Sequence, residues 1–154
     1  MKTIKYTAVT LGQIILSAIY FTILILLFNN KLGGNSVAEL IFYLILPAAA
    51  AVLLCFLFHR GNFRFQKENT KSRASVTRLL VRLCVIAIIL IIEAILEVTD
   101  SANRLSGIIS NAGLSNVIPD PVPYIVCNFN VSIAVSVFPI VYTVMEYLFT
   151  DVKS

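Results

Sequence analysis

The chain has 154 residues, of which 58% are hydrophobic and only 13% are charged, whereas a soluble domain is about 45–50% apolar and about 25% charged. A core of this size cannot bury so many apolar side chains, because small domains leave much of their surface in water. The composition therefore excludes a water-soluble globular fold and indicates that lipid surrounds most of the surface.

Four apolar stretches are long enough to cross a membrane, since about 20 helical residues span about 30 Å of hydrocarbon. They run approximately over residues 8–28, 38–58, 79–98 and 125–149, and asparagine, glycine or proline lies beside several of their ends. The first stretch is too long for a cleaved secretory signal and is not followed by an A-x-A-like site. The sequence predicts an all-α integral membrane protein, a single domain built as a four-helix bundle.

Lysine and arginine are distributed asymmetrically around these spans. With both termini in the cytosol, the outer side holds only Lys31 and Arg104, and the inner side holds nine basic residues. The nine are Lys2, Lys5, Arg60, Arg64, Lys67, Lys71, Arg73, Arg78 and Lys153. Because basic loops are retained in the cytosol, we expect this orientation, with an inner loop over 59–78 and an outer loop over 99–123. The residue usage and the lack of a sorting motif favour a bacterial inner membrane.

The outer loop is longer than a helical bundle needs and should carry structure of its own. Leu105, Ile108 and Ile109 share one face of a helix, Asp100 is a typical N-cap, and Gly113 is a typical stop. We therefore expect a short amphipathic helix on the outer membrane surface. The IPDPVP run at 118–123 should be extended, because proline disfavours helix in the residue before it.

Basic and aromatic side chains are interleaved in the inner loop. This pattern can dock a protein, lipid headgroups or RNA, but basic residues beside helices also fix topology and attract anionic lipid at about 1 kcal/mol each. We favour the lipid interpretation, keep a cytosolic protein partner as the alternative, and find only charge counts in favour of nucleic acid. The candidate docking residues are Arg60, Phe63, Arg64, Phe65, Lys67, Lys71, Arg73 and Arg78.

Four ionisable side chains lie inside the predicted spans, where each costs about 2.5–3.5 kcal/mol at the membrane centre. Arg82, Glu93 and Glu97 share one face of the third helix, which should therefore point into protein. Counting the rise per residue sets Glu146 of the fourth helix level with Arg82. We expect an ion pair between Arg82 and Glu146.

Glu93 is the most informative of these residues, because it lies about 7 Å from the midpoint of its span and needs local partners. Pro47 and Pro139 fall at comparable depth, and each frees the carbonyl four residues earlier, at Tyr43 and Val135. We predict a polar cluster around Glu93 in the outer half of the bundle. Its other members are Tyr20, Thr22, Tyr43 and Ser136. We favour a neutral Glu93 that hydrogen-bonds between helices over a conducting role.

No catalytic pattern is present in the chain, which lacks G-x-S-x-G, H-E-x-x-H, C-x-x-C and Walker motifs. Cys55, Cys84 and Cys127 are interpreted as small buried apolar side chains. His59 has no second metal-ligating group near it in the sequence. We therefore expect no enzymatic activity, no cofactor and no metal site.

Two functions are compatible with these features. The first is a non-enzymatic membrane protein that senses, anchors or protects, that docks a partner, and that forms a homo-oligomer. Small four-helix immunity factors against pore-forming toxins and membrane subunits of antiphage systems share this format, a likeness of architecture that no residue motif carries. The second is an oligomeric ion channel or ion-coupled transporter that uses Glu93. We favour the first.

Overall fold

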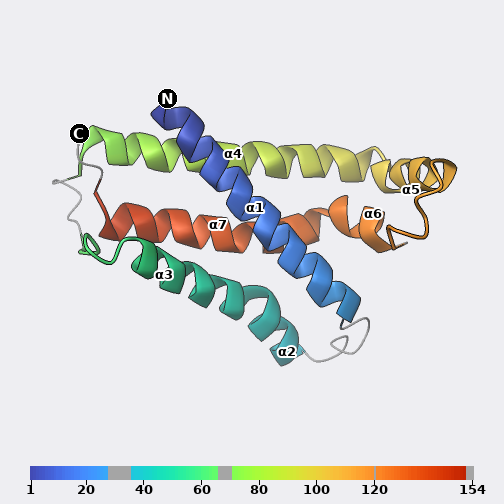
Figure 1. Cartoon of the computed structure of the whole chain (residues 1–154), viewed down its shortest axis with the longest axis horizontal. Coiled ribbons are helices and arrows are strands. Elements are labelled where there is room, and N and C mark those ends of the chain that lie inside the picture. Colours follow the sequence, from blue (N-terminus) through green and yellow to red (C-terminus); the bar gives the residue numbers. More distant parts are fainter. Residues whose placement is uncertain (28–35, 66–70, 120, 152–154) are drawn as a thin grey trace.

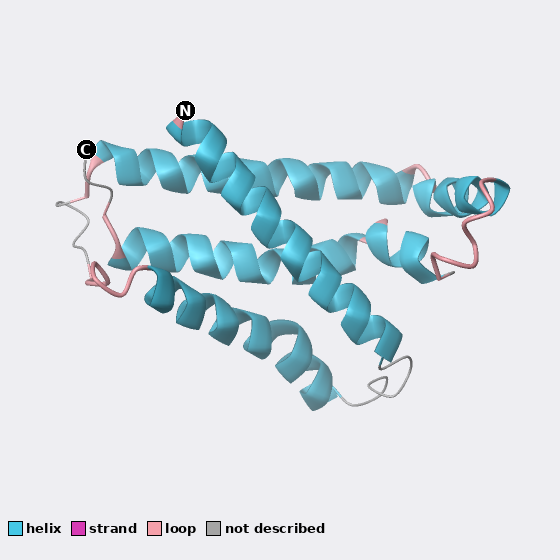
Figure 2. Cartoon of the chain, in the orientation of Figure 1, coloured by secondary structure: helices cyan, strands magenta, loops and turns pink. Residues whose placement is uncertain are grey.

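A computed structural model describes residues 1–27, 36–65, 71–119 and 121–151. All regular structure in these residues is helical (Figure 2). Four helical stretches are long and apolar enough to cross a membrane, namely Lys2–Leu27, Val37–Phe58, Arg73–Val98 and Phe129–Phe149. The prediction of an all-helical chain with four such stretches is confirmed.

Helix α7 (Phe129–Phe149) contacts the three other long helices, α1 (Lys2–Leu27), α3 (Leu46–Phe58) and α4 (Arg73–Val98). α4 runs antiparallel beside α7, α3 packs on another side of it, and α1 crosses α4 and α7 obliquely (Figure 1). The start of α1 and the end of α7 lie toward the same end of the bundle (Figure 1). We call it the basic end, because His59, Arg78 and the end of α7 meet there.

Two helices begin earlier than their apolar stretches. α1 begins at Lys2 rather than near residue 8, and α4 begins at Arg73 rather than near residue 79. Lysine and arginine are good helix formers, so a change from apolar to basic residues marks the end of the apolar surface and not the end of the helix. Ser72 caps α4, since its hydroxyl accepts a hydrogen bond from the Ser75 N–H at 3.2 Å.

The second apolar stretch changes its hydrogen-bond pattern in the middle. A short helix, α2 (Ser36–Leu40), passes into a π-helical turn, η1 (Ile41–Ile45), which continues into α3. The Leu46 N–H bonds the Ile41 carbonyl, five residues earlier, and Pro47 follows immediately. Proline has no N–H for a regular ladder, and a π-turn is one of the few ways in which a helix adjusts its register without ending.

The fourth stretch begins later than predicted. A break at Cys127 and Asn128 separates α7 from a short helix, α6 (Pro121–Val126), so the span starts at Phe129 and not at residue 125. The Asn128 side chain caps α7 by accepting hydrogen bonds from the N–H groups of Asn130 and Val131 at 2.9 and 3.2 Å.

The prediction of an extended segment over 118–123 is wrong at its second half. Pro121 and Pro123 lie in the first turn of α6, where the missing N–H removes no intrahelical hydrogen bond. Residue 120 lies outside the described residues. Proline therefore starts a helix here instead of excluding one.

Helix α5 (Ser101–Asn111) forms in the connection between α4 and α6, where the sequence predicts a helix. Gly113 follows it with a left-handed φ of +72°, as expected for a stop. Asp100 precedes it but is not a side-chain cap, because its carboxylate accepts hydrogen bonds from the Asn103 amide at 2.9 Å. Asp100 therefore occupies the predicted N-cap position, but its side chain does not make the hydrogen bond of an N-cap.

Candidate functional site

Glu146 lies inside the basic end of the bundle, with only 4% of its side chain exposed, and three basic side chains surround its carboxylate. Arg78 Nε lies 3.1 Å and Arg82 Nη2 lies 3.3 Å from Oε1. These contacts are ionic rather than directional, since Oε1 accepts no well-aligned hydrogen bond from the residues that the structure describes. His59 Nε2 lies 3.0 Å from Oε2, and a carboxylate can only accept, so the ring N–H donates.

The ion pair predicted between Arg82 and Glu146 is present, as one contact of a larger group. Arg78 Nη2 donates to the Glu146 carbonyl at 3.2 Å and to the Thr150 hydroxyl at 2.8 Å, and that hydroxyl donates to the same carbonyl. A buried charge is stable only when it is paired and hydrogen-bonded. We call His59, Arg78, Arg82, Glu146 and Thr150 the Glu146 cluster.

Two of the last carbonyls of α7 accept hydrogen bonds from the connection between α3 and α4. The Arg64 N–H donates to the Phe149 carbonyl at 2.7 Å, and Lys71 Nζ donates to the Tyr147 carbonyl at 2.9 Å while lying 3.3 Å from the centre of the Tyr147 ring. A helix leaves its last four carbonyls without intrahelical partners and carries partial negative charge there. The Lys71 side chain and the backbone of Arg64 therefore stabilise the end of α7.

Asp151, just beyond α7, connects this end to the start of α4. Its Oδ1 accepts hydrogen bonds from the Ser72 N–H at 3.3 Å, from the Ser72 hydroxyl at 2.8 Å and from the hydroxyl of the buried Ser75. A carboxylate near a helix N-terminus is favourable because of the partial positive charge there. The end of α7 and the start of α4 thus hold each other in place.

The predicted docking residues fall into two groups. Phe63 stacks on Phe149 with ring centres 4.7 Å apart, Arg78 is buried, and Lys71 contacts Tyr147, so these three make internal contacts. Lys67 lies outside the described residues. The exposed members are Arg60, Arg64, Phe65 and Arg73.

A second polar region lies beside Glu93, around a cavity of about 100 Å³ between α1, α4 and α7. Thr22 and Ser136, which the sequence places near Glu93, line this cavity together with Ser132. Glu93 Oε2 is buried and accepts no hydrogen bond from the described residues. The structure therefore brings part of the predicted cluster together around a carboxyl group that lacks a full set of partners.

Tyr20 and Tyr43 do not belong to this cavity, and the prediction is wrong for both. The Tyr43 ring stacks on Phe21, with centres 5.6 Å apart, and the Tyr20 hydroxyl donates to the Phe42 carbonyl at 3.0 Å. Counting residues fixes the depth of a side chain but not the partner that its face meets. Tyr20 is two residues, or about 200°, from Thr22 on α1, and it faces α3 instead of α4.

Carbonyls near two prolines accept hydrogen bonds from hydroxyl groups of α1. The Ser17 hydroxyl donates at 2.7 Å to the Val135 carbonyl, which Pro139 frees, as predicted. Near Pro47 the carbonyl that accepts a hydroxyl is that of Phe42, to which the Tyr20 hydroxyl donates at 3.0 Å, whereas the prediction names Tyr43. The Leu46 N–H just before Pro47 bonds the carbonyl five residues earlier, at Ile41.

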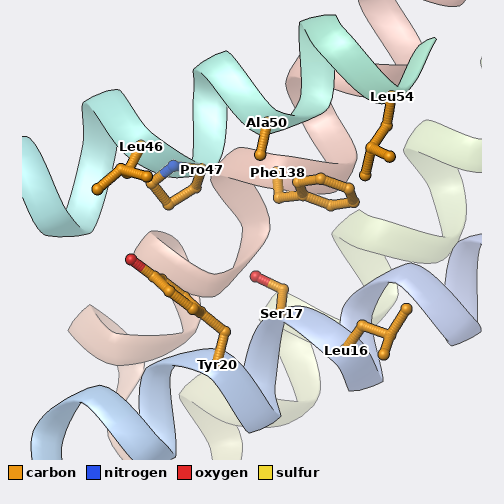
Figure 3. Close-up of a pocket in the computed structure, with 8 residues that line it drawn as sticks. All are labelled: Leu16, Ser17, Tyr20, Leu46, Pro47, Ala50, Leu54 and Phe138. Atoms are coloured by element: carbon orange, nitrogen blue, oxygen red, sulfur yellow. The ribbon is translucent and has the colours of Figure 1, made fainter. Parts of the chain in front are cut away.

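These two hydroxyl groups lie at one crevice between α1 and α3. Figure 3 shows Ser17 and Tyr20 pointing from α1 toward Pro47 and its neighbours, with Phe138 of α7 at the back. The crevice has a volume of about 240 Å³ and is lined mostly by apolar side chains. It is the apolar counterpart, on the other side of α1, of the cavity beside Glu93.

Glu97 is exposed, and its Oε2 accepts a hydrogen bond at 3.1 Å from the N–H of Phe129, the first residue of α7. Arg82 meets Glu146 of α7, and Glu93 lies against Ser132 of α7. Arg82 and Glu93 therefore face α7, as the prediction of a shared inward face requires, whereas Glu97 lies at the exposed end of that face.

Several residues of the basic end are missed by sequence reasoning. Thr150 could be found, because it lies four residues after Glu146 and so on the same side of the chain. Ser72 could be found as an N-cap before Arg73. His59 carries no local signal, since its partner is 87 positions away.

Cys84 is exposed rather than buried, in contrast to the expectation for all three cysteines.

Comparison with protein-family models, with curated proteins and with solved structures finds no match for this chain. Its function is therefore argued from its own residues.

Proposed function

We propose that the chain is an integral membrane protein that crosses a bacterial inner membrane four times with both termini in the cytosol. Large apolar side chains on the long helices point away from the bundle, and Leu16, Leu53 and Ile91 are 57–67% exposed. An apolar surface of this extent is a liability in water and is matched by lipid. The basic end would face the cytosol, since basic loops are retained there, and α5 would lie at the outer surface.

The function that this arrangement supports best is that of a non-enzymatic sensor, anchor or protective subunit, of the immunity or phage-defence type, that docks a cytosolic partner. The observation that carries the proposal is that the inner loop, with its exposed basic residues, is held against the end of α7. The Arg64 N–H bonds the end of α7, and Phe65 packs edge-on against Phe149 at 5.8 Å. A charged surface on a rigid frame loses little entropy on binding and selects partners of opposite charge.

The test is reversal of the exposed charges with the internal ones left intact. A tagged chain with Arg60→Glu, Arg64→Glu and Arg73→Glu should lose the cytosolic proteins that co-purify with wild type from membranes, measured by quantitative mass spectrometry. Arg104→Glu, also exposed but beyond the other end of α4, is the matched control and should retain them. Reporter tags at both termini check that topology is unchanged.

Retention of the same proteins by the triple variant would overturn the docking role. Anionic lipid is the competing occupant, because about 1 kcal/mol per basic residue is available from the membrane surface. If the triple variant differs from wild type only in its affinity for vesicles that contain phosphatidylglycerol, the exposed residues serve lipid, and the protein-docking proposal falls.

A homo-oligomer is part of the same proposal. α3 carries the run from Ala48 to Ala51, of which Ala49 is exposed, and small residues allow close approach of helices in a membrane. The mass of the detergent-extracted protein, corrected for bound detergent, should exceed that of one 17.0 kDa chain. A monomeric mass under mild extraction would contradict this part.

One observation favours a second candidate function, an oligomeric ion channel or ion-coupled transporter. The cavity beside Glu93 places a carboxyl group and three hydroxyl-bearing side chains in an otherwise apolar part of the bundle, and polar residues at such depth often mark an ion pathway. Reconstituted wild type should then conduct ions, and Glu93→Gln should conduct less. Liposomes without flux, or equal flux in both proteins, would remove this candidate.

A further inference from the structure

The cavity beside Glu93 is a small space with a defined set of oxygen atoms. Its polar lining consists of Thr22, Glu93, Ser132 and Ser136, contributed by α1, α4 and α7. A volume of about 100 Å³ exceeds the roughly 10–15 Å³ that one water needs. The cavity therefore has room for a small ion together with water.

Two of the three hydroxyl hydrogens in this cavity are directed at backbone carbonyls of α7 and its cap, and not at Glu93. The Ser136 hydroxyl donates to the Ser132 carbonyl at 2.8 Å, so its remaining lone pairs can only accept. The Ser132 hydroxyl has one hydrogen, which it donates to the Asn128 carbonyl at 3.2 Å. Glu93 Oε2 receives no hydrogen bond from the described residues. Among the described residues, the cavity lacks a group that several of its oxygen atoms can bind at once.

The charge of Glu93 also lacks a counterpart. Within the described ranges, the basic side chains that form ion pairs, His59, Arg78 and Arg82, all do so with Glu146. An ionised carboxylate at this depth needs neutralisation. A proton would neutralise it but would supply one donor, whereas a cation would neutralise it and coordinate the hydroxyl oxygens as well.

We propose that the cavity binds one monovalent cation of the size of sodium, held by the Glu93 carboxylate and by hydroxyl oxygens of Thr22, Ser132 and Ser136. Hard cations take oxygen ligands, and calcium sites in proteins typically contain several carboxylates. Here one carboxylate balances one charge, and a divalent ion would leave a net positive charge among apolar side chains. The inference rests on the proposed membrane location and is independent of both partner docking and ion conduction.

The experiment uses the full chain in lipid nanodiscs at constant ionic strength, with sodium chloride replacing choline chloride. Sodium should raise the Tm of wild type in a saturable way, because a ligand that binds only the folded state stabilises it. Binding of radioactive sodium to wild type should saturate at one ion per chain. Glu93→Gln should abolish both effects, and Ser136→Ala should weaken sodium binding at least tenfold.

Glu97→Gln is the matched control, since it removes a carboxylate one turn away on the same helix, and it should respond to sodium as wild type does. Equal Tm in sodium and choline together with no bound radioactive sodium would show that Glu93 carries only a proton and would overturn the proposal. A sodium response that survives in Glu93→Gln would also overturn it. A chain that stays monodisperse without detergent would instead refute the membrane location, so the two failures are distinguishable.

Discussion

Glu146 and Glu93 lie at the same helix interface, between α4 and α7, and their surroundings differ sharply. Glu146 lies at the basic end, where Arg78 and Arg82 reach it from the first turns of α4 and His59 from the end of α3. Glu93 lies about eleven residues further along α4, where within the described part of the chain no basic side chain pairs with it. Counter-charge is available near an end of the bundle, where basic residues are tolerated in a membrane protein, but not deep in an apolar span.

The largest effect expected from this comparison is that of Glu146→Gln. The substitution keeps the size of the side chain and leaves Arg78 and Arg82 buried without a counter-charge, and breaking a buried pair in this way costs about 3–5 kcal/mol. The free energy of unfolding, measured in detergent micelles by denaturant titration, should fall by that amount. Glu93→Gln, measured in sodium-free buffer, should lose little or nothing.

A double substitution separates the lost pair from other consequences of the change. Glu146→Gln combined with Arg82→Met removes one of the uncompensated charges together with its counter-charge, so the combined loss should be smaller than the sum of the two single losses. Additive losses, or a larger loss for Glu93→Gln than for Glu146→Gln, would break the comparison.

An intermediate effect is expected for Ser17, the partner of an uncharged buried group. Ser17→Ala leaves the Val135 carbonyl, which Pro139 cannot serve, without its side-chain donor. A buried acceptor without a partner costs about 1–3 kcal/mol. The same denaturant titration should show a loss in this range.

The test of this assignment is restoration of the missing N–H. In the Ser17→Ala, Pro139→Ala protein, residue 139 can donate to Val135, so the loss due to Ser17→Ala should be smaller in the Pro139→Ala background than in wild type. An equal loss in both backgrounds would show that the Ser17 hydroxyl does not compensate for the proline.

The sequence predicts the apolar elements of this fold better than its polar contacts. Apolar length alone identifies the four long helical stretches, and helical periodicity places Arg82, Glu93 and Glu97 on one face. The ends of helices are less accessible, because basic residues such as Lys2 and Arg73 continue a helix that hydrophobicity would end.

The polar contacts depend on where distant segments meet. Arg82 and Glu146 are predictable as partners because both lie in spans whose depth can be counted. His59 meets Glu146 only because the end of α3 turns toward the end of α7, and no local pattern encodes that turn. The Tyr20 hydroxyl bonds the carbonyl of Phe42 rather than that of Tyr43, within a π-turn that proline alone does not predict.

The smallest effect is expected for Glu97, a third carboxylate on the same face of α4, which extends the comparison of Glu146 with Glu93. Glu97 is exposed and accepts a hydrogen bond from the first N–H of α7, so its charge interacts with the positive end of a helix dipole. In Glu97→Gln the side-chain oxygen can still accept this hydrogen bond, and only the charge is lost. Since such interactions contribute about 0.3–1 kcal/mol at exposed sites and are screened by salt, the loss should lie in this range and shrink at high ionic strength. A salt-independent loss, or one comparable to that of Glu146→Gln, would mean that exposure does not set the energetic rank of these carboxylates.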